Sequence, residues 1–211
     1  MSSSLKIKIC GLRRECDVDF VNSAGVDFVG FVFAGSKRQV TPAQASVLKK
    51  RLSPDIKSVG VFVNESIENI KRICKNGIID LIQLHGNEDG DFIKTLKNEI
   101  NLPVIKAVKA LSKDYIKEEI RNDADFVLLD SFKENSFGGT GSIFDWTVVP
   151  DIKKPVFLAG GLNINNIKQA VDMVHPFCVD ISSGVETDGF KDERKIFEIT
   201  KLVRGLEYEY N

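Results

Sequence analysis

Short apolar runs alternate with amphipathic stretches eight times along the chain. The apolar runs, each about as long as one strand, lie at residues 6–11, 27–33, 58–63, 81–86, 104–108, 125–130, 156–161 and 178–183. After each run, apolar residues recur at the spacing of one helix face, over residues 13–23, 41–52, 66–75, 91–100, 112–121, 144–149, 164–174 and 193–206. The second helix is predicted to begin with Thr41 as its N-cap and Pro42 at its first position. The pattern predicts eight β-α units.

Eight β-α units without a long linker indicate parallel strands joined by crossover helices. In a chain of 211 residues, this repeat predicts the α/β class and a single (β/α)₈ TIM barrel with eight parallel strands. An open, doubly wound sheet is the alternative arrangement of the same units. Because no linker, low-complexity tract or boundary interrupts the pattern, we expect one domain over residues 1–211.

The alternation of side chains along each strand predicts which residues point into the barrel. Apolar residues at alternate positions are expected to face the helices, so the polar residues between them face inward. The rule sends Lys8, Cys10, Gln83, His85, Lys106, Asp130 and Asp180 to one interior. Interior charges are costly unless they are paired, so this cluster predicts a functional site at the carboxyl ends of the strands. A purely structural pair such as Lys8–Asp180 is the alternative.

Composition and charge exclude several classes of function. The formal net charge is −1 and the pI about 6.2, which argues against nucleic-acid binding. No apolar run is long enough to span a membrane, and the start of the chain has no apolar signal-peptide core, so we expect a cytosolic protein. With two histidines and no C-x-x-C pair, no metal site is expected. We expect a small-molecule ligand and a monomer.

Glycine-rich segments follow the last three predicted strands. Glycines let backbone N–H groups approach an anion closely, and the loops after strands seven and eight form the usual phosphate site of TIM barrels. The candidate phosphate-binding residues are Gly139, Gly141, Gly160, Gly161, Ser182, Ser183 and Gly184. Ordinary turns are the alternative for any one loop, but two such loops side by side favour a phosphorylated ligand.

Several short motifs resemble, in order, those of phosphoribosylanthranilate isomerases. They are Lys8-Ile9-Cys10-Gly11-Leu12, Ser36-Lys37-Arg38, Gln83-Leu84-His85-Gly86, Leu128-Leu129-Asp130-Ser131, Leu158-Ala159-Gly160-Gly161-Leu162 and Asp180-Ile181-Ser182-Ser183-Gly184-Val185-Glu186. Each motif alone is weakly specific, whereas the ordered set is strongly specific. The resemblance implies an Amadori rearrangement of N-(5-phosphoribosyl)anthranilate by general acid and base catalysis, with no cofactor.

The resemblance also implies roles for single residues. Cys10 would be the base, helped toward the thiolate by Lys8, and Asp130 the acid, kept protonated by desolvation. Arg38 would meet the anthranilate carboxylate, and Asp180 the amino and sugar groups. Residue by residue there are structural alternatives: a buried hydrophobe for Cys10, a cap for Asp130, a surface charge for Arg38 and a counter-ion of Lys8 for Asp180. His85 would support the site, or else be a satisfied interior histidine.

Two positions depart from the family pattern, and other functions remain open. Arg13 replaces a common threonine, and Ser142 replaces a common lysine. Indole-glycerol-phosphate synthase, ribulose-phosphate epimerase and a dual-substrate isomerase of histidine biosynthesis are related alternatives. The first usually carries an extra N-terminal segment, the second needs metal-binding histidines, and the third an aspartate in place of Cys10. A catalytically inactive phosphosugar-binding barrel is the alternative from another class.

Overall fold

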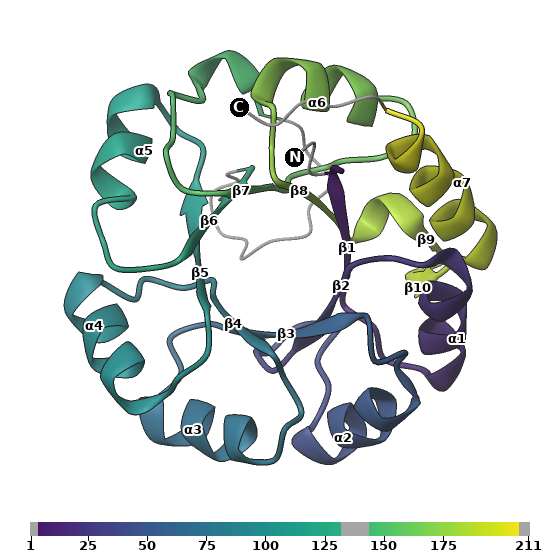
Figure 1. Ribbon diagram of the computed structural model, residues 1–211, viewed down its shortest axis with the longest axis horizontal. Helices are drawn as coiled ribbons and strands as arrows, with labels where there is room; N and C mark the ends of the chain where they lie inside the picture. The colour runs from purple at the N-terminus through teal and green to yellow at the C-terminus, as the bar shows by residue number, and fades with distance from the viewer. Residues whose placement is uncertain (1–3, 132–143, 207–211) are drawn as a thin grey trace.

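The computed structural model describes residues 4–131 and 144–206, and in it eight parallel strands form a closed barrel. The strands are β1 (Lys6–Cys10), β2 (Phe28–Val32), β3 (Lys57–Phe62), β4 (Leu81–Leu84), β5 (Val104–Lys109), β6 (Phe126–Asp130), β7 (Val156–Leu158) and β8 (Cys178–Ile181). Strand β8 pairs with β1 and closes the ring, as Figure 1 shows along the barrel axis. The predicted TIM barrel is confirmed, and the open doubly wound sheet is excluded.

Helices surround the barrel on the outside (Figure 1). They are α1 (Glu15–Ala24), α2 (Pro42–Arg51), α3 (Ile67–Lys75), α4 (Gly90–Glu99), α5 (Lys113–Glu119), α6 (Ile167–Val174) and α7 (Glu193–Arg204). Between β6 and β7, the described residues contain only a short 3₁₀ helix, η1 (Trp146–Val148), where the sequence predicted a helix over 144–149. The predicted N-cap of α2 is confirmed, because the Thr41 side chain accepts a hydrogen bond from the Gln44 backbone N–H.

Beyond β8 the chain forms a small hairpin that the apolar pattern does not predict. A second 3₁₀ helix, η2 (Ser183–Val185), leads into β9 (Glu186–Thr187), which pairs antiparallel with β10 (Phe190–Lys191). In the register of this hairpin, Glu186 lies opposite Lys191. The hairpin precedes α7 and lies beside the start of α1 in Figure 1.

The barrel interior has an apolar layer toward the amino ends of the strands. Four phenylalanines contact one another there, with ring centroids 5.4 to 6.4 Å apart: Phe28, Phe126, Phe157 and Phe177. The same inner cluster also contains Val59, Leu81, Ile105, Ala107, Leu128, Ala159 and Cys178. A larger apolar cluster lies between the strands and the helices. The interior is therefore packed at one end, which leaves the carboxyl ends of the strands for a site.

Strand β5 corrects one prediction about orientation. The alternation rule placed Ile105 and Ala107 outside and Lys106 inside the barrel. In the structure Ile105 and Ala107 pack into the inner cluster, while Val104 and Val108 belong to the outer one. Lys106 therefore faces outward.

Lys106 is nevertheless buried, because it has partners on that side of the sheet. Its ammonium donates to the Gly86 carbonyl at 2.8 Å and to Glu88 Oε2 at 2.9 Å. The prediction failed because both faces of β5 are apolar, so alternation alone could not choose between them.

Among the described residues, no helix is long and apolar enough to cross a membrane.

Candidate active site

A cavity of about 710 Å³ opens at the carboxyl ends of the strands. It gathers every catalytic and substrate-binding residue predicted from the sequence: Cys10, Arg38, His85, Asp130 and Asp180. These residues come from β1, β6, β8 and the loops after β2 and β4, so distant parts of the chain meet only in the folded barrel. For this set, a shared site is favoured over scattered structural roles.

Cys10 ends β1 and points its thiol against the neighbouring strand β2. A Cβ on Gly30 would lie 2.5 Å from the Cys10 Sγ, so the glycine makes room for the thiol. Burial raises the pKa of Cys10, and the positive charges of Lys8 and Lys191 offset only part of this effect. Lys8 thus acts in the expected direction, but it does not bring the pKa of Cys10 below its ordinary value.

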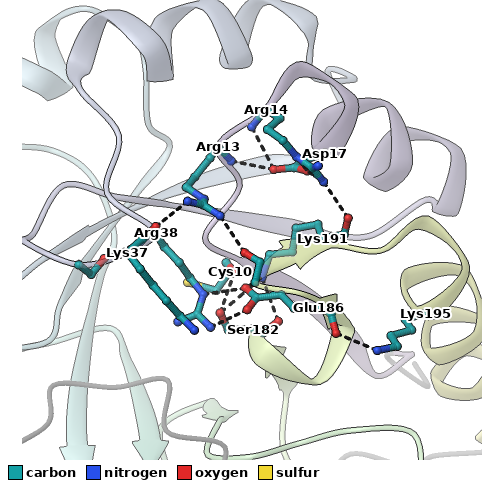
Figure 2. Close-up of polar contacts among 12 residues, drawn as sticks. Cys10, Arg13, Arg14, Asp17, Lys37, Arg38, Ser182, Glu186, Lys191 and Lys195 are labelled. Atoms are coloured by element: carbon teal, nitrogen blue, oxygen red, sulfur yellow. Dashed lines mark hydrogen bonds and ion pairs between the residues drawn. The ribbon is translucent and has the colours of Figure 1, made fainter.

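Arg38 is a buried cation of the loop between β2 and α2, not a surface charge. Its side chain is 9% exposed, and its stem lies against Gly11, where a Cβ would meet the Arg38 Cδ at 2.5 Å. Nε donates to Glu186 Oε1 at 2.7 Å and Nη2 to Glu186 Oε2 at 2.8 Å (Figure 2). The hydrogen bonds with Glu186 raise the pKa of Arg38, although burial opposes them.

Glu186 and Lys191 lie directly behind Arg38 of this site, although neither was singled out from the sequence as a site residue. Lys191 contacts Glu186 Oε1 at 2.8 Å, and both side chains are almost fully buried. Burial alone would raise the pKa of Glu186, but Arg38 and Lys191 outweigh it and lower the pKa to about 2. Glu186 closes a motif quoted above, which was its only signal; Lys191 had none.

A chain of hydrogen bonds crosses the barrel interior from β8 to β6. The Lys8 ammonium donates to Asp180 Oδ2 at 2.7 Å and to Gln83 Oε1 at 2.9 Å. Gln83 Nε2 lies 2.8 Å from His85 Nδ1, and His85 Nε2 lies 3.2 Å from Asp130 Oδ2. Burial tends to lower the pKa of Lys8, but the charges of Asp180 and Cys10 outweigh this, and the pKa is raised. The structural Lys8–Asp180 pair exists, and it is part of the site.

Asp130 ends β6 with its carboxyl group at the cavity. Its side chain is 14% exposed, and its Oδ1 accepts a hydrogen bond from the Ser131 backbone N–H at 2.7 Å. Together with His85 at Oδ2, this contact fixes the plane of the carboxyl group. Asp130 therefore presents a defined orientation to a ligand in the cavity.

The loops after β7 and β8 supply the other wall of the cavity. Gly160 and Gly161, with φ of 86° and 67°, end β7 earlier than predicted and line the cavity with Ser182 and Ser183. Gly184 is not among the described lining residues. Gly139 and Gly141, also predicted to bind phosphate, lie outside the described residues, as does the departure at Ser142.

The departure at Arg13 has a structural role. Its guanidinium donates to the Lys37 carbonyl at 2.7 Å and to the Gly189 carbonyl at 2.8 Å, as Figure 2 shows for Lys37. It also lies 5.1 Å from the centroid of the Phe190 ring. Arg13 therefore joins the loops after β1 and β2 to the β9–β10 hairpin.

Within residues 4–131 and 144–206, no cluster of three or more His, Cys, Asp or Glu could hold a metal ion.

Comparison with known sequences identifies a family over nearly the whole chain. The family model described as N-(5'phosphoribosyl)anthranilate (PRA) isomerase matches residues 7–202. The N-(5'-phosphoribosyl)anthranilate isomerase of Endomicrobium trichonymphae is 50% identical over 201 residues, covering 95% of this chain and 99% of the relative. That of Lachnoclostridium phytofermentans is 44% identical over 207 residues, covering 92% and 95%.

Comparison with solved structures identifies the same family. The phosphoribosyl anthranilate isomerase of Thermotoga maritima has a TM-score of 0.83 and 33% identity, and covers 96% of this chain and 100% of its own. Another, in complex with reduced 1-(o-carboxyphenylamino)-1-deoxyribulose 5-phosphate, has a TM-score of 0.80 and 33% identity, with the same coverage. The chain belongs to the N-(5'-phosphoribosyl)anthranilate isomerase family, whose members catalyse an aldose–ketose isomerisation in tryptophan biosynthesis.

Proposed function

We propose that Cys10 is the general base and Asp130 the general acid of the isomerisation of N-(5-phosphoribosyl)anthranilate. One observation carries the proposal: both side chains line the same cavity, Cys10 from β1 and Asp130 from β6. The two strands lie on separate sides of the barrel mouth in Figure 1. An acid and a base can therefore reach one sugar from different directions.

The reaction proceeds in balanced proton transfers. Asp130 gives a proton to the ring oxygen, the C1–O bond breaks, and the nitrogen lone pair forms C1=N. Cys10 takes the proton from C2, the electrons form C1=C2, and the C1=N π electrons return to nitrogen as the enolamine. Loss of the C2 hydroxyl proton and protonation of C1 then give the ketose, 1-(2-carboxyphenylamino)-1-deoxyribulose 5-phosphate. The raised pKa of Cys10 makes its thiolate a strong base, although less of it is ionised at neutral pH.

The remaining lining residues suit the rest of the substrate. The phosphate is assigned to the loops after β7 and β8, where Gly160, Gly161, Ser182, Ser183 and Gly184 lie. Arg38 receives the anthranilate carboxylate, because a guanidinium binds a carboxylate through paired hydrogen bonds. Asp180 meets the amino and sugar groups, while His85 holds Asp130. The phosphorylated ligand of the related structure fits this division, since it carries both a carboxyphenyl group and a phosphate.

The decisive experiment follows the loss of anthranilate-type fluorescence on freshly made substrate. We expect the wild type to turn over and both Cys10→Ser and Asp130→Asn to lose at least about 100-fold in rate. Cys74→Ser is the matched control, because Cys74 lies on α3 outside the barrel, and it should keep the wild-type rate. Full activity of either site variant would remove that residue from the mechanism. An inactive wild type that still binds the phosphorylated ligand would favour a binding barrel instead.

We also propose that the protein is one domain over residues 1–211, monomeric and cytosolic. The closed barrel, whose strands run from residue 6 to residue 181, supports the single domain. Analytical ultracentrifugation would test the monomer, and a single cooperative unfolding transition would test the single domain. Activity in the soluble fraction of a cell lysate would test the location.

A further inference from the structure

A buried carboxylate lies behind Arg38, and neither the proton transfers nor the phosphate loops use it. The Glu186 side chain is 6% exposed. Arg38 lines the cavity, whereas Glu186 and Lys191 are not among its described lining residues. Figure 2 shows Glu186 in contact with both cations. Because Glu186 does not reach the cavity, it can act on a ligand only through Arg38.

The contact between Glu186 and Arg38 uses one particular edge of the guanidinium. The group carries five N–H donors in a rigid plane. Glu186 occupies the side edge, formed by Nε and one N–H of Nη2. The terminal edge, formed by Nη1 and the other N–H of Nη2, is a second site for a bidentate carboxylate. One guanidinium can therefore bind a protein carboxylate and a ligand carboxylate together.

The pair is held from both ends, so the guanidinium cannot easily turn. The Arg38 stem rests on Gly11. Glu186 is fixed by Lys191, its partner across the hairpin, which also donates to the Ser182 carbonyl at 2.9 Å. Two cations around one carboxylate leave one positive charge uncompensated within the group. That charge matches a single ligand carboxylate.

We propose that Glu186 is a positioning residue that makes Arg38 selective for a carboxylate on the aromatic ring of the substrate. Glu186 holds the side edge of the guanidinium, so that the terminal edge is ready for the ligand before it arrives. The inference rests on the proposed function, in which Arg38 receives the anthranilate carboxylate. It adds the residue that gives Arg38 this selectivity.

The test compares two ligands that differ only in the carboxylate. They are reduced 1-(o-carboxyphenylamino)-1-deoxyribulose 5-phosphate and its counterpart with an unsubstituted phenyl ring, measured by calorimetry. The variants are Glu186→Gln, Arg38→Met and the control Glu88→Gln, whose carboxylate is equally buried and paired with Lys106. Glutamine cannot accept on both sides, because its amide nitrogen would face the Nη2 donor.

We expect the wild type to prefer the carboxylated ligand, and Glu186→Gln to reduce this preference about tenfold. Affinity for the phenyl ligand should change less than about twofold, and Glu88→Gln should keep the wild-type preference. In turnover, Glu186→Gln should raise KM more than it lowers kcat. An equal loss for both ligands would make Glu186 a structural residue only. Tighter binding of the carboxylated ligand would show that Glu186 competes with it, which also overturns the proposal.

The variants also separate this proposal from the one beneath it. If the wild type and Arg38→Met show the same preference between the ligands, Arg38 does not receive the carboxylate, and the proposed function is wrong at that residue. If Arg38→Met abolishes the preference and Glu186→Gln leaves it intact, only the inference about Glu186 fails.

Discussion

A single lysine determines how the interior hydrogen-bond chain is oriented. An ammonium is only a donor, so Lys8 requires the oxygen of the Gln83 amide, and the Gln83 nitrogen then faces His85 Nδ1. That nitrogen is also only a donor, so Nδ1 must offer its lone pair. The neutral His85 ring therefore carries its proton on Nε2, directed at Asp130. A residue on β1 in this way sets the proton position beside the proposed acid on β6.

This orientation predicts the tautomer of His85. Long-range ¹H–¹⁵N correlation spectra of the neutral ring should show His85 protonated on Nε2 alone. The chain has two histidines, so His175→Asn leaves the His85 signals by themselves. Gln83→Glu replaces the donor by an acceptor, and we expect Nδ1 to gain a proton in that variant. A wild-type ring protonated on Nδ1 would contradict the chain as described.

Among the elements, the β9–β10 hairpin does more for the site than its four strand residues suggest. It places Glu186 and Lys191 behind Arg38, and Arg13 ties it to the loops after β1 and β2. Arg13 and Arg14 both lie over the Phe190 ring, at 5.1 and 4.7 Å from its centroid. The mouth of the barrel is thus braced by side chains that do not touch the cavity.

Removing the Arg13 contacts should weaken substrate binding more than it slows the chemical step. We expect Arg13→Thr to raise KM by about three- to tenfold, because two charge-assisted hydrogen bonds are lost near the surface. The value of kcat should stay within about twofold, because neither Cys10 nor Asp130 moves. Arg51→Ala is the control, since Arg51 ends α2 and pairs with Asp19. An unchanged KM in Arg13→Thr, measured by steady-state kinetics, would show that the loops hold their places without it.

Most helices and strands could be predicted because each is determined by the pattern of apolar and polar residues within its own segment. Strand alternation and helix spacing located the units, and they brought Cys10, His85, Asp130 and Asp180 to one end of the barrel. Alternation failed at β5, where both faces are apolar and the partners of Lys106 lie in the loop after β4. The Glu186–Lys191 pair could not be predicted, because it depends on a hairpin with strands of two residues. Such short strands leave no periodic signal.

At the scale of the whole molecule, the buried charges make stability depend on pH. The pKa of Glu186 is about 2 in the folded protein and about 4.5 when unfolded. Its depressed pKa stabilises the fold above pH 4.5, and that contribution is lost as the pH falls toward 2. It amounts to at most about 3 kcal/mol, less the screening by water near the cavity.

Denaturant unfolding over this range measures the effect. The wild type should have a higher free energy of unfolding than Glu186→Gln. This difference should be largest near neutral pH and should shrink below about pH 4.5. Glu118→Gln is the control, because Glu118 is exposed and its ion pair with Arg121 lies at the surface, so its difference from wild type should stay flat. A Glu186→Gln difference that did not change with pH would mean that the ion pairs contribute nothing to acid stability.

The layer of four phenylalanines has one further consequence. It fills the barrel interior at the amino ends of the strands, so that, among the described residues, the cavity opens at the carboxyl ends. Substrate and product then pass through the same opening, and each must leave before the other can bind. The active-site cavity therefore has one opening for both ligands. Accumulated ketose is expected to inhibit the next turnover because it occupies this opening.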